Sequence, residues 1–158
     1  MGGDESYACA SAAAIGFGKS GARAYDSILR LYREREAVAQ VAPGFLQALV
    51  ETGEARAWAE LIRASVYGKH PWLRRRAVEQ LVRKLKDQQD EEGFKTLLSL
   101  LEDKSFHMRR AAIGSLEDLG DPRAVEALEK RAATEPDARI RGAAAAAVLK
   151  LRKSTPSK

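Results

Sequence analysis

A short sequence pattern recurs along the chain at an interval of 32 to 35 residues. The segment MRRAAIGSL at 108–116 returns 32 residues later as IRGAAAAAV at 140–148, and it occurs 35 residues earlier as LRRRAVEQL at 73–81. An interval of about 20–50 residues indicates a repeat architecture, in which one unit cannot bury its apolar face alone. We therefore expect the chain to fold as a stack of similar units.

A second pattern keeps the same step. The segment GDPRA at 120–124, followed by Leu128, is matched 67 residues upstream by GEARA at 53–57, followed by Leu61. Because 67 residues is two successive intervals, both patterns belong to one register. An Ala-Arg-Ala segment at 22–24 extends that register toward the N-terminus.

Apolar residues between these anchors follow helical spacing, and glycine and proline fall where helices would end. Asp121, just before Pro122, and Asp137 are natural N-caps. We predict an all-α fold, a right-handed α-solenoid (superhelix) of about four and a half two-helix repeats. Residues 1–153 are predicted to form a single domain and 154–158 a frayed tail. The predicted helices span 5–18, 22–36, 43–51, 54–66, 72–86, 91–102, 106–119, 122–133 and 138–153.

Alanine concentrates in the second helix of successive repeats. Runs occur at 12–14, 111–112 and 143–147. A small side chain lets neighbouring helices approach closely, so we interpret these runs as packing surfaces.

The combined pattern is an apolar-Arg-x-Ala-Ala segment, then Leu-Gly-Asp-Pro-Arg-Ala, then an apolar-rich helix. It resembles the short HEAT-like repeat found in phycobilin lyases and many scaffold proteins. The likeness covers nearly the whole chain and is strongest over 106–152. The resemblance implies a stacked helical fold, and such repeats serve mostly as protein-binding surfaces. The fold by itself does not fix a function.

In this register, residues 4–16 correspond to the second helix of a unit, so the pattern starts in mid-repeat. We interpret the chain as the C-terminal part of a longer protein, or as one completed by a partner. DESY at 4–7, GFLQAL at 44–49 and GEARA at 53–57 are similar to the C-terminal helical domain of aminopeptidase N-type zinc aminopeptidases. That resemblance implies a domain lying over a separate catalytic domain. The chain itself has no His-Glu-x-x-His motif.

Cysteine and histidine are scarce in this chain. With one cysteine, Cys9, there is no internal disulfide framework, and we expect Cys9 to be a small core residue. The two histidines, His70 and His107, lack the neighbouring ligands of a metal site. We predict no metal, no cofactor and no catalytic residue.

The longest uncharged stretch, 37–50, is shorter than the about 20 residues that a membrane-spanning helix needs. The stretch 6–18, near the N-terminus, is shorter still. It follows two acidic residues instead of the basic segment of a signal peptide. We therefore expect a cytoplasmic chain without membrane contact.

Positive charge is the one feature that points to a partner. The chain carries 27 Lys and Arg against 22 Asp and Glu, a net charge of +5, and seven of the cations fall within 69–86 beside the single acid Glu79. The repeat equivalents of Trp72 are polar, which predicts an exposed contact residue. The candidate partner-binding residues are Trp72, Arg75, Arg76, Arg83 and Arg110.

The repeat makes Arg74, Arg109 and Arg141 equivalent. Arginines at this position are expected to form a structural ladder, pairing with an aspartate or with the carbonyl groups at a helix end of a neighbouring turn. Asp103 and Asp137 are placed to take part.

Three interpretations follow. The first is a non-catalytic module that binds a protein or peptide as part of a larger protein such as a zinc aminopeptidase. The basic cluster suits an acidic partner of this kind. The second is nucleic-acid binding through a basic concave face, as in HEAT-like DNA glycosylases, which would weaken steeply with salt. The third is a HEAT-like lyase or hydroxylase, for which no acid, base or ligand set stands out in the sequence.

Overall fold

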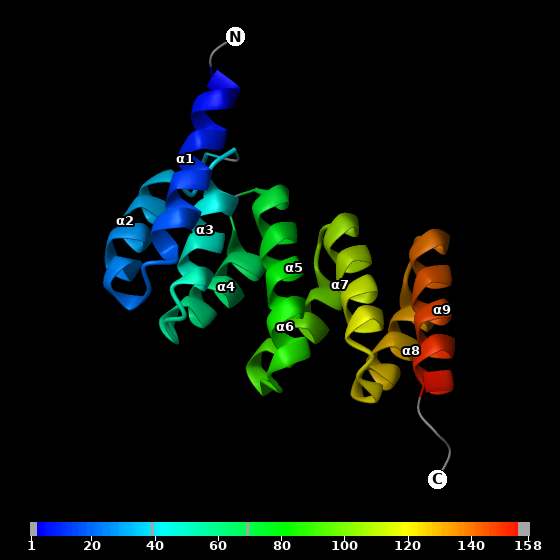
Figure 1. Cartoon of the computed structure of the whole chain (residues 1–158). Helices are drawn as coiled ribbons and strands as arrows, with labels where there is room; N and C mark the ends of the chain where they lie inside the picture. The colour runs from blue at the N-terminus through cyan, green and yellow to red at the C-terminus, as the bar shows by residue number, and fades with distance from the viewer. Residues whose placement is uncertain (1–2, 39, 69, 155–158) are drawn as a thin grey trace. The chain divides into compact units, whose positions relative to one another are not determined.

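The computed structural model describes residues 3–38, 40–68 and 70–154. Within them the chain forms nine α-helices and three short 3₁₀ helices, and no strand (Figure 1). The all-α class is confirmed. The elements are α1 (Gly3–Gly18), η1 (Ala22–Ala24), α2 (Tyr25–Arg35), α3 (Ala42–Glu51), α4 (Arg56–Tyr67), α5 (Pro71–Asp87), α6 (Glu91–Ser99), η2 (Leu100–Glu102), α7 (Phe106–Leu119), η3 (Pro122–Ala124), α8 (Val125–Thr134) and α9 (Ala138–Ser154).

Three of the predicted helices are partly 3₁₀. The segments 22–36 and 122–133 begin as η1 and η3, and 91–102 ends as η2. Before η3, the Asp121 side chain accepts a hydrogen bond from the Arg123 N–H, which satisfies a donor that the tight first turn leaves unpaired. The Asp137 carboxylate accepts from the Arg139 N–H at 2.9 Å in the same way, so both predicted caps are confirmed.

The chain divides into two compact units, Met1–Gln80 and Leu81–Lys158, and the boundary lies inside α5. The single domain predicted for 1–153 stays a prediction. Ser154 is the last residue of α9, and residues 155–158 of the predicted tail lie outside the described residues.

In the first unit, α3 is the central helix, and α1, α2 and α4 pack against it. Its core is built from large side chains that are almost completely buried. They are Tyr25, Ile28, Tyr32, Leu46, Leu49, Leu61 and Leu73.

In the second unit, α7 packs against α6, η2 and α9, and α8 packs against α9. Ala112 of α7 and Ala144 and Ala147 of α9 are fully buried, as expected for helices in close contact, whereas Ala145 and Ala146 are exposed. The larger core residues of this unit are Leu81, Leu97, Leu100, Met108, Ile113, Leu116, Leu128 and Ile140.

Among the side chains of helix α1 that the structure describes, the buried ones lie on one face. Ala14 and Gly18 are buried, whereas Cys9 is exposed. The prediction that Cys9 belongs to the core is wrong, because this residue lies about 140° around the helix from Ala14.

Gly18 marks a close approach of two helices. A Cβ atom at this position would lie 2.4 Å from the carbonyl oxygen of Ala48 in α3, a backbone atom that cannot move alone. We expect Gly18→Ala to lower the free energy of unfolding by about 1–3 kcal/mol. Urea denaturation followed by circular dichroism measures the change.

Gly16 provides the matched control in the same helix, since nothing lies within 4 Å of a Cβ atom added there. Gly16→Ala should be neutral or stabilise by up to about 1 kcal/mol. Equal destabilisation by both variants would contradict the close approach at Gly18.

Candidate functional site

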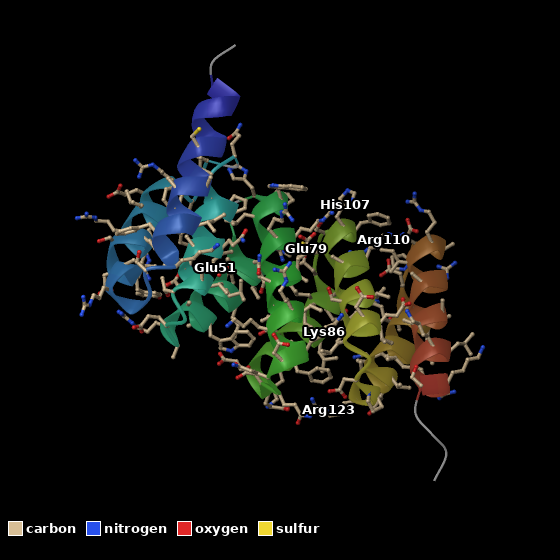
Figure 2. The ribbon with its side chains drawn as sticks, in the orientation of Figure 1. Glu51, Glu79, Lys86, His107, Arg110 and Arg123 are labelled. Carbon is tan, nitrogen blue, oxygen red and sulfur yellow. The ribbon has the colours of Figure 1, made fainter. Side chains whose placement is uncertain are left out.

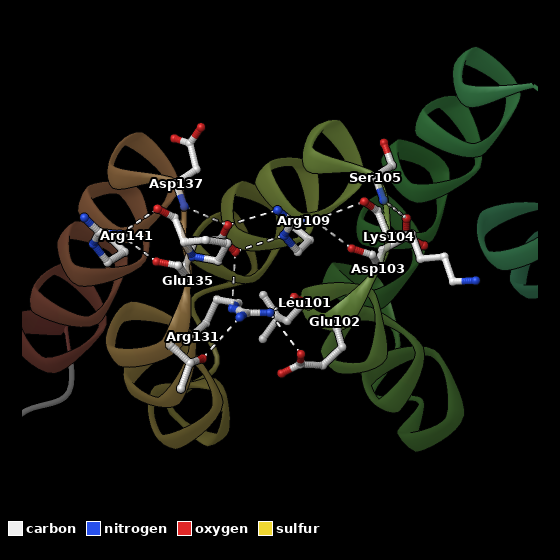
Figure 3. Close-up of polar contacts among 12 residues, drawn as sticks. Leu101, Glu102, Asp103, Lys104, Ser105, Arg109, Arg131, Glu135, Asp137 and Arg141 are labelled. Carbon is white, nitrogen blue, oxygen red and sulfur yellow. Dashed lines mark hydrogen bonds and ion pairs between the residues drawn. The ribbon is translucent and has the colours of Figure 1, made fainter.

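The three predicted ladder arginines all donate hydrogen bonds to backbone carbonyl groups that lie earlier in the chain. Figure 3 shows these contacts for Arg109 and Arg141. Arg109 Nη1 contacts the carbonyl oxygens of Asp103 at 2.9 Å and Lys104 at 3.2 Å. Arg141 Nη1 repeats this geometry with Glu135 and Pro136, both at 2.8 Å. Arg109 and Arg141 each stand five and six residues after their acceptors, so each closes the loop that precedes its own helix.

Arg74 plays a similar part in the first unit. Its Nε donates to the carbonyl oxygen of Ser65 in α4 at 3.0 Å. Carbonyl groups in the last turn of a helix lack intrahelical partners and carry the negative end of the helix dipole, so a guanidinium is a favourable donor to them.

Glu135 supplies a carboxylate to the ladder that the sequence did not reveal. Its two carboxylate oxygens accept hydrogen bonds from Nε and Nη2 of Arg109, each at 2.9 Å. The Glu135 side chain is completely buried and that of Arg109 is 14% exposed. This bidentate pair joins the start of α7 to the loop before α9, and so links two successive repeats.

A second arginine approaches the same carboxylate from α8. Arg131 Nε lies 3.4 Å from Glu135, and its Nη1 donates to the carbonyl oxygen of Leu101 and to Glu102, both at 2.9 Å (Figure 3). Arg131 is buried on the apolar face of α8 close to Leu128. The buried Glu135 carboxylate therefore contacts two arginines from neighbouring helices, and Glu102 is a second carboxylate partner of Arg131.

The electrostatics follow from these contacts. The hydrogen bonds from Arg109 lower the pKa of the Glu135 carboxyl below its ordinary value of 4.5, although burial opposes the shift. Arg139, through its side chain and its backbone N–H, lowers the pKa of Asp137 to about 2. Both carboxyl groups are thus held ionised.

Asp103 and Asp137 accept hydrogen bonds at the starts of helices. Asp103 Oδ1 accepts from the Ser105 N–H at 2.8 Å, and the Asp137 side chain binds Arg139 of its own helix. Glu135 is the repeat equivalent of Asp103, because it also accepts from the N–H two residues later. The side chain of Glu135 is one methylene group longer than that of Asp103, and its carboxylate contacts Arg109.

Trp72 lies near the start of α5 with 48% of its surface exposed. The guanidinium groups of Arg75 and Arg76 lie 5.4 and 5.3 Å from its ring, within the range of cation–π attraction. Glu79, labelled on α5 in Figure 2, accepts from both arginines at 3.1 and 3.0 Å. The residues predicted here as partner contacts therefore form one exposed cluster with a net charge of +1.

A groove of about 250 Å³ lies beside this cluster, within the first unit. Its lining combines two of the predicted residues with side chains that sequence reasoning missed. The lining residues come from α1, α3, α5 and the loop before α3, and are Ile15, Gln40, Pro43, Gly44, Leu46, Gln47, Trp72, Arg76 and Gln80.

Arg83 and Arg110 belong to the second unit. Both are exposed, and Arg110 lies on α7 one turn after His107 (Figure 2). Their role in binding a partner stays a prediction.

The histidines make other contacts. His70 Nε2 lies 2.5 Å from the carbonyl oxygen of Ala37, and the ring of His107 meets that of Phe106 edge to face at 5.2 Å. Across the described ranges, no group of three or more His, Cys, Asp or Glu side chains is placed to hold a metal ion. No described helix is both long enough and apolar enough to span a membrane.

Comparison with known proteins places the repeats in a family. The sequence matches the family described as HEAT repeats over residues 61–148, more than half of the 158 residues. The chain is a HEAT-repeat protein. No curated protein matches this HEAT-repeat chain.

A solved structure has the same fold as this HEAT-repeat chain. It is the complex of CpcE and CpcF of phycocyanin lyase from Nostoc sp. PCC7120, matched with a TM-score of 0.64 and 21% identity over 89% of this chain and 87% of that chain. The prediction of a HEAT-like helical repeat protein is confirmed. Neither comparison supports an aminopeptidase origin.

The buried pair should dominate the stability of the second unit. Glu135→Gln keeps the shape of the side chain but removes the carboxylate that Arg109 binds with two hydrogen bonds, whereas Arg131 keeps its ion pair with Glu102. We expect the free energy of unfolding to fall by about 3 kcal/mol, as measured by urea denaturation.

Glu129 offers a control in the same unit, since its ion pair with Arg152 is exposed on both sides. Glu129→Gln should change the free energy of unfolding by at most about 1 kcal/mol. A Glu135→Gln variant as stable as this control would contradict a structural role for the pair.

Acid should weaken the same interaction. The pKa of Glu135 is lower in the folded chain than in the unfolded one. Its contribution to the free energy of unfolding is therefore fully present above pH 4.5 and is lost as the pH falls through the lowered pKa. We expect the urea midpoint to decline below about pH 5, and more steeply in the wild type than in Glu135→Gln. Parallel pH profiles for the two proteins would contradict this assignment.

Proposed function

We propose that this chain is a non-catalytic HEAT-repeat module that binds another protein, and that it acts as one subunit of an assembly. The observation that carries the proposal is the cluster of Trp72, Arg75 and Arg76 on α5. A half-exposed tryptophan flanked by arginines has the composition of an energetic centre of a protein interface, where Trp, Tyr and Arg are enriched.

Trp72 differs in its surroundings from the other aromatic residues. Phe17 and Tyr67 are also exposed, at 51% and 74%, but within the described part of the chain no arginine lies over either ring. Tyr25, Tyr32, Phe45 and Phe94 are at most 6% exposed, because burial of their rings stabilises the fold. Trp72 keeps 48% of its surface in solvent, so covering it with a partner would release water from a large apolar area.

The cluster is also organised before a partner arrives. Arg75 and Arg76 are held by Glu79 and lie over the Trp72 ring. Side chains that already occupy a defined geometry lose less conformational entropy on association, which favours affinity.

The structural neighbour supports a protein partner as well, because it was solved as a complex of CpcE and CpcF. This likeness also favours a second candidate function, that of a subunit of a phycobilin lyase. The match covers most of both chains, whereas neither comparison favours an aminopeptidase. As the parent assembly of this binding module, we therefore prefer a lyase complex to an aminopeptidase.

A partner should co-purify with the tagged chain from its native source in a fixed ratio, as quantified by mass spectrometry. Trp72→Ala should abolish that association while leaving the circular dichroism spectrum unchanged. Tyr67→Ala, which removes another exposed aromatic side chain of the first unit, is the control and should retain the partner. Recovery of the wild-type chain without any stoichiometric protein would contradict the proposed function.

The lyase form is tested by adding the chain, with and without its partner, to phycocyanin and following the visible absorbance of the chromophore. A spectral change that requires both proteins would support a lyase subunit. An unchanged spectrum in the presence of a stable complex would leave a binding module without lyase activity.

A further inference from the structure

We propose that the groove beside Trp72 binds an extended, acidic segment of the partner protein. This inference rests on the proposed binding function and adds to it a site and a ligand chemistry. It combines three observations on the groove: unused amide groups, a single kind of charge, and a limited volume.

Three glutamine side chains line the groove, and they come from separate parts of the first unit. Gln40 precedes α3, Gln47 lies on α3 and Gln80 lies on α5. Within the described part of the chain, none of the three makes a side-chain hydrogen bond. Each amide offers two N–H donors and a carbonyl acceptor, which are the groups that an extended peptide backbone requires.

The charge of the groove selects for acidic residues. Among the described residues that line it, Arg76 is the one that carries a charge. Glu79 accepts a hydrogen bond from Arg76 Nη1, and Arg75 also contacts this carboxylate. Two guanidinium groups thus share one carboxylate, so a second carboxylate from a partner would find a charge-assisted donor there.

The size of the groove favours a peptide over a small-molecule cofactor. Its volume of about 250 Å³ lies below the about 300–1,000 Å³ that is typical of small-molecule sites. Apolar atoms of Ile15, Pro43 and Leu46 also border it. A segment with one acidic side chain next to an apolar one therefore matches the chemistry of the lining.

The test uses the full chain and three blocked dipeptides as probes: N-acetyl-Glu-Leu N-methylamide and its Gln-Leu and Lys-Leu analogues. Binding is followed by ¹H–¹⁵N NMR on the Trp72 indole N–H and the glutamine side-chain amides. We expect saturable shifts with the Glu probe at millimolar concentration. The Gln probe should bind about tenfold more weakly, because it lacks the charge that Arg76 recognises.

Two substitutions separate the charge from the amides. Arg76→Gln should weaken the Glu probe about tenfold and remove the preference for Glu over Gln. Gln47→Ala should weaken the Glu and Gln probes alike, since it removes contacts to the backbone. The matched control is Arg30→Gln, an equal loss of charge at an exposed residue of α2, which should leave binding unchanged.

Equal affinity for the Lys and Glu probes, or no saturation up to about 20 mM, would overturn the inference. So would Arg76→Gln and Gln47→Ala variants that retain a partner lost from Trp72→Ala. That last result would leave the proposed binding function standing, so the two failures can be told apart.

Discussion

The bidentate contact between Arg109 and Glu135 is the constraint on which the second unit depends most. Stacked repeats are held mainly by apolar contacts, which set the distance between helices but fix their rotation and register only loosely. A buried ion pair requires two hydrogen bonds with defined geometry, because a misplaced charge in the interior is costly. The pair fixes how the loop before α9 meets the start of α7, and the carbonyl contacts of Arg109 and Arg141 close the loops on either side.

The sequence was sufficient to predict the helical class and most helix boundaries. The repeated Arg-x-Ala-Ala and Gly-Asp-Pro-Arg-Ala patterns combine spacing, capping residues and helix breakers, and these local signals agree with one another. The structure differs from these predictions at three helix ends, where the chain forms 3₁₀ turns, and at Cys9. The 3₁₀ turns at 22–24 and 122–124 occur with and without a proline, so no single residue type predicts them. The exposure of Cys9 follows from its position around α1, which composition does not reveal.

The candidate site was less predictable. The exposure of Trp72 followed from the polar residues at equivalent positions, and the three ladder arginines followed from the register. The contact of Glu135 with Arg109 was not predicted, although Glu135 is the repeat equivalent of Asp103. A side chain longer by one methylene group does not stand out in a repeated sequence pattern. The groove was missed for another reason. Gln40, Gln47 and Gln80 occupy unrelated positions in the repeat, and only the folded first unit brings their amides together.

The boundary between the two units lies inside α5, which has a consequence for how the chain gains and loses its structure. Neither half of the sequence contains the whole of that helix, and buried residues on both sides of the boundary, Val78 and Leu81, belong to its one apolar stripe. Helices lengthen cooperatively, so order on one side of the boundary favours order on the other. Each unit therefore takes part of its buried core from the same helix.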